Sequence, residues 1–204
     1  MEYFVLSLDR GDRSHIFNKN KKALPELKLF KAVNGYDKQE TILELKKLGV
    51  EYHNLDYPYY GTLACWITKV KMLQHQIKHK IPYICFIEDD LLVSEHYWRT
   101  FVTERARLIN THVNIVRLCP WGEGYITSIE SAKRLMKIIK KEGVKCSIDN
   151  QLRSMKEKYI ELDPPATLCI ETNHGDCMKT DKIPDNFQDL LKKVDGICTW
   201  LLLR

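Results

Sequence analysis

The stretch that decides the fold is Ile81-Pro82-Tyr83-Ile84-Cys85-Phe86-Ile87-Glu88-Asp89-Asp90. Its first part is a nearly continuous apolar run, which is typical of a central strand buried on both faces of a parallel sheet. The run ends abruptly in three acidic residues. Ligands of open α/β sheets bind beyond the carboxyl ends of the strands. The stretch therefore predicts a central strand over residues 81–87, with a candidate site directly after it.

Predicted strands and helices alternate on both sides of this segment. We expect further strands at residues 3–8, 29–33, 113–118 and 124–127. We expect helices at residues 38–48, 62–78, 95–109, from residue 129 to a stop at Gly143, and at 150–158. The helix at 62–78 is the clearest, because its apolar residues recur at spacings of three and four. This alternation predicts an α/β class, with a mostly parallel central sheet flanked by helices.

Length and composition limit the classes of protein that fit. The 204 residues suit one domain over residues 1–204, and a net charge of +5 suits a small anionic ligand but not nucleic acid. The longest clean apolar run is far short of the ~20 residues of a membrane helix, so we expect no transmembrane segment. Asp9 and Arg10 interrupt the apolar start too early for a signal peptide. Seven cysteines without a CxxC pair favour a reduced, cytoplasmic protein.

The acidic tripeptide has the chemistry of a metal site. Strand side chains alternate, so we expect Glu88 and Asp90 to point to one side and Asp89 to the other. Two carboxylates at a strand end can hold Mg²⁺ or Mn²⁺ together with substrate phosphates. The alternative is a polar loop whose acids cap the next helix.

Residues 81–90 also resemble the "LP-hydrophobic-LEDD" segment of glycosyltransferase family 25, the lipopolysaccharide and collagen β-galactosyltransferase family. Further segments resemble the family pattern in the family's order: Val5-Leu6-Ser7-Leu8-Asp9-Arg10 with Arg13, Phe30-Lys31-Ala32-Val33-Asn34-Gly35, Gly61-Thr62-Leu63-Ala64-Cys65, residues 122–135, Ser147-Ile148-Asp149-Asn150, and residues 159–165. The resemblance spans about residues 3–168 and leaves a C-terminal tail at 169–204. It implies a GT-A-like fold, a nucleotide-sugar donor and Mn²⁺ (or Mg²⁺).

The resemblance also implies roles for single residues. Glu88 and Asp90 would form a variant of the DxD motif, with Asp90 on the metal and Glu88 on the ribose or a metal-bound water. Arg10 and Arg13 would contact the donor diphosphate, although a solvated turn is an equal alternative for both. The residues predicted to bind the donor are Leu6, Ser7, Arg10, Arg13, Asn34, Glu88 and Asp89. The predicted metal ligands are Asp90 and His174, the latter also readable as an ordinary loop residue.

The proposed catalytic base is Asp149, which matches the family's acidic position before the predicted helix at 150–158. Family 25 enzymes are similar in being inverting transferases, so one carboxylate should deprotonate the acceptor hydroxyl. The alternative for Asp149 is a helix N-cap.

Two positions depart from the family pattern. Thr68-Lys69 replaces the family's Ser-His pair, and Asn34 replaces an acid. The first change puts any function of that histidine in doubt, and the second suggests a donor other than UDP-galactose.

Aromatic residues that could stack on sugar faces are Tyr57, Tyr59, Tyr60 and Trp121, whereas Trp66 lies in the apolar stripe of its helix and is expected in the core.

The sequence therefore predicts an inverting, metal-dependent glycosyltransferase. It would move a hexose, galactose or glucose, from a UDP-sugar to a glycan, lipid-linked or protein acceptor, in a bacterial or virus-infected cytosol. The alternative is a catalytically inactive module of the same fold that binds sugar nucleotides or glycans. The sequence determines neither the acceptor and linkage nor the oligomeric state.

Overall fold

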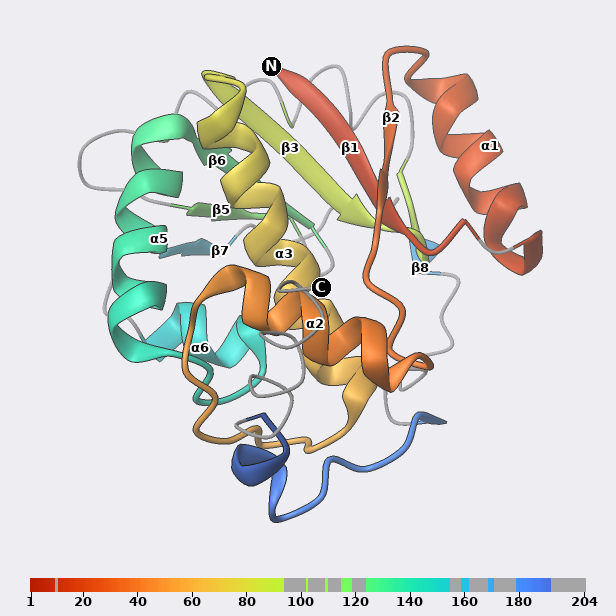
Figure 1. The fold of residues 1–204 in the computed structure, drawn as a ribbon. Coiled ribbons are helices and arrows are strands. Elements are labelled where there is room, and N and C mark those ends of the chain that lie inside the picture. The colour runs from red at the N-terminus through yellow and green to blue at the C-terminus, as the bar shows by residue number, and fades with distance from the viewer. Residues whose placement is uncertain are drawn as a thin grey trace, which may run out of the picture.

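The computed structural model of the chain describes residues 1–9, 11–93, 102, 109, 115–118, 124–154, 159–161, 169–170 and 179–191. Helices and strands alternate along these residues in a mixed α/β fold (Figure 1). The helices are η1 (Gly11–Arg13), α1 (Ser14–Ala23), α2 (Lys38–Leu48), α3 (Tyr60–Lys78), α5 (Ile129–Glu142) and α6 (Ile148–Ser154). The strands are β1 (Glu2–Ser7), β2 (Lys28–Lys31), β3 (Tyr83–Glu88), β4 (Leu91–Leu92), β5 (Ile115–Arg117), β6 (Gly124–Ser128), β7 (Tyr159–Glu161) and β8 (Cys169–Ile170).

Six of the strands form one sheet in the order β2-β1-β3-β6-β5-β7, and β4 pairs with β8 in a separate two-stranded sheet. β1 pairs in parallel with β2 and β3, and β5 pairs in parallel with β7. β6 runs antiparallel to both of its neighbours. Five of the six strands thus run the same way, which confirms the predicted α/β class with a mostly parallel sheet.

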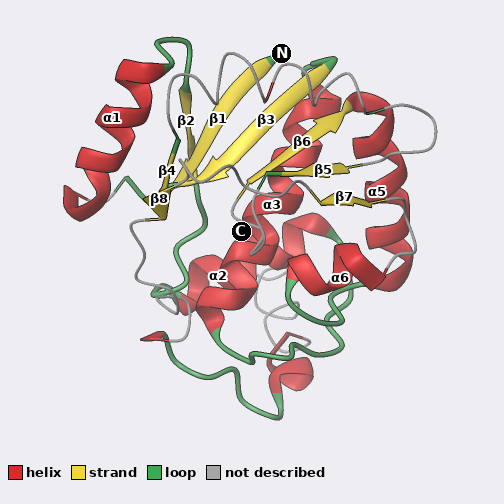
Figure 2. Ribbon diagram, turned by 180° about the vertical axis from the view of Figure 1, so that it is seen from behind, coloured by secondary structure: helices red, strands yellow, loops and turns green. Residues whose placement is uncertain are grey.

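The sheet is buried on both faces, as the apolar run at residues 81–87 predicts. Side chains of β1 and β3 alternate between two apolar clusters: Phe4 and Phe86 belong to one, and Val5 and Ile87 to the other. Helices α2, α3, α5 and α6 lie on one face of the sheet, and α1 lies beside its β2 edge (Figures 1 and 2). None of the helices in the described ranges is long and apolar enough to cross a membrane.

Helix α3 is the central helix of the larger cluster. Trp66 is fully buried in it, as expected. Residues 179–191, which lie beyond the part that resembles the family, also pack here: the Phe187 ring meets those of Tyr52 and Tyr60 edge to face, at 4.8 and 5.9 Å between centroids. Tyr60 is therefore a core residue and not a sugar-stacking one.

Two glycines bring the turn after β2 against the start of α3. A Cβ atom at Gly35 would lie 2.4 Å from the Cα of Gly61, which leaves no room for a side chain. This close approach places the backbone of residues 33–36 beside the first turns of α3, at the carboxyl edge of β1 and β3, where the candidate site lies.

Candidate active site

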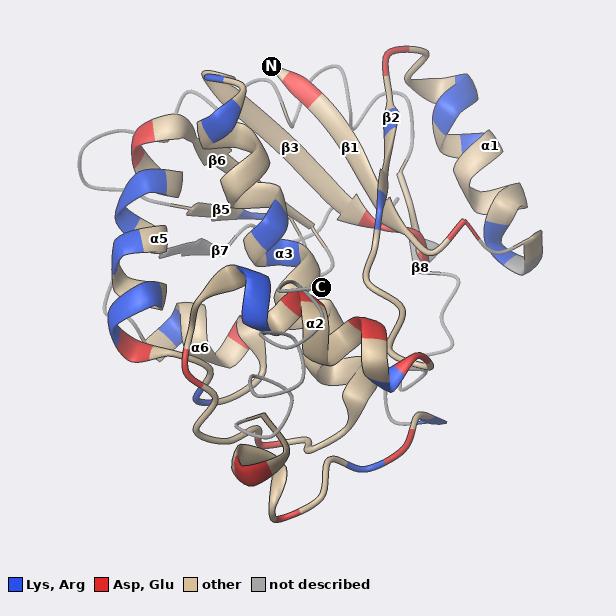
Figure 3. Ribbon diagram, in the orientation of Figure 1, with Lys and Arg blue, Asp and Glu red and all other residues tan. Residues whose placement is uncertain are grey.

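A pocket with a volume of about 120 Å³ lies at the carboxyl ends of β1 and β3, beside the first turns of α3. Register brings these ends together, because Leu6 pairs with Glu88 and Ser7 with Lys31. The pocket is lined by five of the predicted donor-binding residues, Leu6, Ser7, Arg13, Glu88 and Asp89. The acidic end of β3 (red in Figure 3) thus opens into it.

Asp89 holds Arg13 in the pocket. The Ser7 hydroxyl donates to Asp89 Oδ2 at 2.5 Å, and the Arg13 guanidinium donates to Asp89 Oδ1 at 2.6 Å. Both oxygens of Asp89 are thereby engaged, and the Arg13 side chain is only 19% exposed. The Arg13 guanidinium is thereby held in a defined orientation, and a guanidinium is a group that suits a phosphate.

The expected alternation of the three acidic side chains is wrong beyond Glu88. Asp90 Oδ2 lies 3.7 Å from the Arg13 guanidinium, so Asp90 and Asp89 approach the same cation. Glu88 instead pairs with Lys69. The physical reason is that β3 ends at Glu88 and a turn follows, so the two-residue repeat of a strand no longer applies.

Lys69 joins the acidic strand end to the proposed base. Its Nζ lies 2.7 Å from Glu88 Oε1 and 3.1 Å from Asp149 Oδ1. The Lys69 side chain is 5% exposed, whereas those of Glu88 and Asp149 are 25% and 26% exposed. One buried ammonium therefore serves two carboxylates from segments about 60 residues apart in sequence.

This arrangement shifts the pKa values of the two buried partners. Burial alone would lower the pKa of Lys69, but Asp149 and Glu88 outweigh it and raise that pKa well above 10.5. Burial raises the pKa of Glu88 above 4.5; Lys69 opposes this shift, and Asp90 and Asp149 add to it. Lys69 is thus a permanent positive charge at neutral pH.

Asp149 lies within α6 and not before it. It is the second residue of this helix, so the N-cap alternative is wrong. The Tyr125 hydroxyl, from β6, donates to the same Asp149 Oδ1 that Lys69 contacts. The nitrogen of Lys69 also lies 5.4 Å from the centre of the Tyr125 ring. Asp149 is therefore held by residues of α3 and β6.

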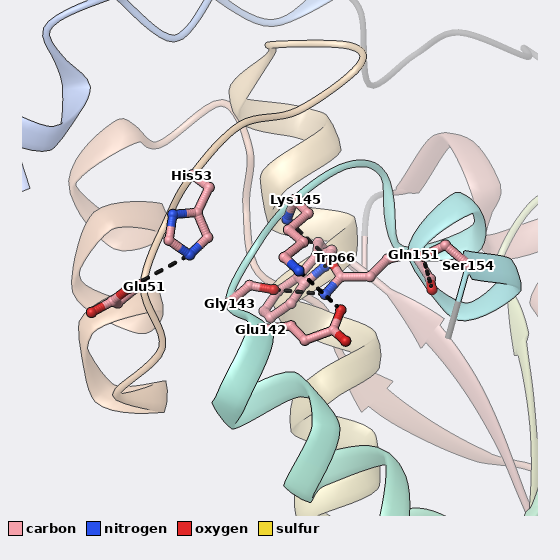
Figure 4. A network of polar contacts seen from close by, with 8 residues as sticks. All are labelled: Glu51, His53, Trp66, Glu142, Gly143, Lys145, Gln151 and Ser154. Carbon is pink, nitrogen blue, oxygen red and sulfur yellow. Dashed lines mark hydrogen bonds and ion pairs between the residues drawn. The ribbon is translucent and has the colours of Figure 1, made fainter. Parts of the chain in front are cut away.

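A second network fixes α6 against α3 and α5 (Figure 4). The indole N–H of Trp66 donates to Gln151 Oε1 at 2.9 Å, and Gln151 Nε2 donates to the Gly143 carbonyl at 2.6 Å. Trp66 and Gln151 are fully buried. Trp66 is one turn before Lys69, and Gln151 is two residues after Asp149, so this network connects the segments that carry the two charged groups.

Asp56 anchors the start of α6 from the surface. Its carboxylate accepts from the Ser147 backbone N–H at 2.7 Å, from the Ser147 hydroxyl at 3.0 Å and from the Asn150 amide at 2.5 Å. Burial would raise the pKa of Asp56, but these hydrogen bonds outweigh it and lower the pKa below 3.8. Asp56 thus caps the helix that carries the proposed base.

We expect Asp56→Asn to lower the Tm at neutral pH, and the difference from wild type to shrink in acid. A carboxyl with a lowered pKa in the folded state stabilises it above 3.8, and this contribution is lost as pH falls through the folded-state pKa. Thermal unfolding followed by circular dichroism at pH values of about 7 and about 2 measures the effect. Glu130→Gln, in an exposed pair with Lys133, is the matched control. A difference that persists unchanged in acid would contradict this role.

The other predicted site residues divide into two groups. Asn34 lies in an adjoining hollow with Lys31 and Tyr36, and its Oδ1 accepts from the Tyr36 backbone N–H at 3.1 Å, so the structure does not bring it to the main pocket. Arg10 and His174 lie outside the described residues, as does Trp121. The lysines of α5 at positions 133, 137, 140 and 141 are exposed and form a solvated face (Figure 3).

Sequence reasoning missed three residues of the site. Lys69 takes the position of the family's histidine, and its place among the apolar residues of α3 was the signal that it is buried. Thr180 lines the pocket and accepts the Gly61 backbone N–H at 2.8 Å, although no motif marks it. Tyr36 lines both hollows and is 51% exposed, although no motif marks it.

Among the described residues, a divalent cation could be held by a single carboxylate together with the phosphates of a bound substrate. They contain no group of three or more His, Cys, Asp or Glu side chains that could enclose a metal ion. Asp89 and Glu88 are engaged by Arg13 and Lys69. However, Mg²⁺ and Mn²⁺ are commonly bound by one or two carboxylates together with substrate phosphates. Asp90, two residues after the end of β3 and 3.7 Å from the Arg13 guanidinium, supplies a carboxylate of this kind.

Comparison with known proteins gives a family for the first half of the chain. The model described as glycosyltransferase family 25 (LPS biosynthesis protein) matches residues 1–119, which include the acidic segment but not Asp149. No curated protein matches the chain.

Solved structures also show similarity. One is a glycosyltransferase involved in the glycosylation of the major capsid of PBCV-1, with 11% identity, a TM-score of 0.41, and coverage of 80% of this chain and 82% of that chain. Another, from Desulfovibrio desulfuricans G20, is assigned as a nucleotide-diphospho-sugar transferase, with 10% identity, a TM-score of 0.44, and coverage of 80% and 81%.

Proposed function

The chain belongs to glycosyltransferase family 25, and we propose that it is an inverting, metal-dependent enzyme that transfers a hexose from a UDP-sugar to a hydroxyl group. The observation that carries this proposal is the convergence of three groups at one sheet edge. Arg13 can bind a diphosphate, Asp90 can hold a cation, and Asp149 can accept a proton. Arg13 contacts Asp89 and Asp90, directly after β3, and Lys69 links Glu88 to Asp149.

The donor would bind with its diphosphate beside Arg13. Asp89 and Ser7 keep the guanidinium in place before the donor arrives, so little side-chain entropy is lost on binding. Tyr36, which lines both hollows, would lie against the uracil base. Glu88, at the end of β3, would contact the ribose or a metal-bound water.

Asp90, with His174 as a second predicted ligand, would hold Mn²⁺ or Mg²⁺, whose chemistry here is to neutralise the charge that develops on the leaving diphosphate. Of these two predicted ligands, Asp90 lies in the described part of the chain and His174 lies outside it.

Asp149 would act as the general base. The oxygen of the acceptor hydroxyl attacks the anomeric carbon while its proton passes to the Asp149 carboxylate. The bond between the anomeric carbon and the diphosphate oxygen breaks, and UDP leaves with that electron pair. Attack opposite the leaving group inverts the configuration at the anomeric carbon. Galactose and glucose are the hexoses we propose, with a glycan, lipid-linked or protein acceptor.

We place this reaction in the cytosol of a bacterium or of a virus-infected cell. Cys65, Cys85 and Cys146 are free thiols, as a reducing compartment favours.

A donor panel tests the proposal. Thermal-shift and calorimetric titrations with UDP-galactose, UDP-glucose, UDP-N-acetylglucosamine and GDP-sugars, each with Mn²⁺, should select a UDP-hexose. Hydrolysis of that donor, followed as UDP release, should then occur and should accelerate with an acceptor. Binding without hydrolysis of any donor would favour the alternative, an inactive sugar-nucleotide-binding module. Absence of binding to any nucleotide sugar would reject both.

A further inference from the structure

We infer that Lys69 is the positioning residue of this site: it fixes Asp149 through Oδ1, so that Oδ2 is the oxygen that receives the acceptor's proton. The inference rests on the proposed function, because it concerns the residue proposed as general base. Nothing in the family pattern supplies it, since a histidine stands there in the pattern to which residues 61–69 are similar.

Two donors contact the same carboxylate oxygen of Asp149. Lys69 Nζ donates to Asp149 Oδ1 at 3.1 Å, and the Tyr125 hydroxyl donates to the same oxygen. Among the described residues, both of these side-chain hydrogen bonds to the Asp149 carboxylate therefore go to Oδ1. A carboxylate oxygen that already accepts two strong donors is a poor proton acceptor, so the proton of an attacking hydroxyl is directed to Oδ2.

Lys69 is more deeply buried than its two carboxylate partners. The Lys69 side chain is 5% exposed, while Glu88 and Asp149 are each about five times more exposed. Lys69 and Glu88 both line the pocket, and Asp149 is reached through Lys69. The position of Lys69 is itself rigid, because it stands in the middle of α3 and Trp66, one turn earlier, is tied to Gln151 of α6.

The positive charge of Lys69 is needed because Glu88 and Asp149 lie close together. Glu88 and Asp149 share the Lys69 ammonium, and without it two carboxylates would face each other in a poorly solvated place. They would then separate, and Asp149 would lose its orientation. A displacement of about 1 Å in a reacting group can cost about 10²-fold in rate.

A double-mutant cycle tests the inference. We compare wild type, Lys69→Met, Asp149→Asn and the double variant, using the donor selected by the panel. Lys69→Met should lower kcat by about 10²-fold while KM for the donor changes by less than about threefold. In the Asp149→Asn background, the same lysine change should alter the residual rate by less than about threefold, because the residue through which Lys69 acts is already absent.

Two further variants control the cycle. Lys71→Met removes another lysine of α3 from a carboxylate pair, the one with Glu44 at 2.5 Å, and should leave kcat unchanged. Lys69→Arg keeps the charge and should recover at least about tenfold of the lost rate, which also covers the case in which Lys69→Met does not fold.

The outcomes separate the inference from the proposed function. Equal effects of Lys69→Met in both backgrounds, or wild-type kcat in Lys69→Met, would overturn the role of Lys69 while leaving the transferase intact. So would a Lys69→Arg variant as inactive as Lys69→Met. Absence of turnover by the wild-type protein with every donor would overturn the proposed function, and the inference with it.

Discussion

Asp149→Asn is expected to lower kcat by about 10²- to 10⁴-fold, the usual contribution of a general base, while the affinity for UDP with Mn²⁺ stays nearly unchanged. The asparagine has almost the same shape and can still accept from Lys69 and Tyr125, so α6 should remain in place. What it loses is the ability to take a proton from the acceptor. Steady-state kinetics and calorimetric titration with UDP measure the two quantities separately.

The matched control is Asp37→Asn. Asp37 caps α2 by accepting from the Glu40 backbone N–H at 2.9 Å, and asparagine is an equally good N-cap, so neither kcat nor Tm should change. An Asp149→Asn enzyme with wild-type kcat would remove Asp149 from the mechanism. A parallel loss of UDP affinity would instead assign Asp149 to donor binding.

Asp90→Ala is expected to abolish both transfer and donor hydrolysis, with kcat reduced by at least about 10²-fold, because the carboxylate proposed to hold the cation is removed. The loss of the cation site should also be measurable in the absence of turnover. Mn²⁺ should no longer increase the affinity of the variant for UDP, as measured by calorimetry. Addition of EDTA to wild type should have the same effect on activity, and Mn²⁺ should reverse it.

Circular dichroism must show that Asp90→Ala is folded, because Asp90 is buried beside Arg13. Glu130→Gln, an exposed carboxylate of α5, is the control that should keep Mn²⁺-dependent UDP binding. If Asp90→Ala keeps both Mn²⁺-dependent binding and turnover, the cation is not held by Asp90.

Local signals predicted the described elements well, whereas the helix expected at residues 95–109 lies almost wholly outside the described residues. Helix α2 runs over Lys38–Leu48 as expected, because Asp37 caps its start and Gly49, with a φ of 62°, ends it. Helix α3 begins at Tyr60, two residues before the predicted start, and β3 runs from Tyr83 to Glu88 instead of 81–87. These shifts are small because caps, turns and side-chain periodicity act over a few residues.

Contacts between distant segments could not be predicted in this way. The antiparallel direction of β6 within a mostly parallel sheet leaves no mark in the residues 124–128 themselves. The sequence also placed Asp149 before a helix, where an N-cap was a reasonable alternative, because nothing local indicates that Lys69 and Tyr125 both reach its Oδ1. The acidic alternation failed for a related reason, since Arg13 and the turn after Glu88 set where Asp89 and Asp90 lie.

The residues alone therefore determined the α/β class, the buried central strand with its acidic end, and the resemblance to one transferase family. Those properties depend on hydrophobic periodicity and on short motifs, which are local. The tertiary structure alone decided that Lys69, from the middle of an apolar helix, is the charge shared by Glu88 and Asp149. A buried lysine is tolerable only where two segments bring carboxylates to it, and that meeting depends on how α3, β3 and α6 pack.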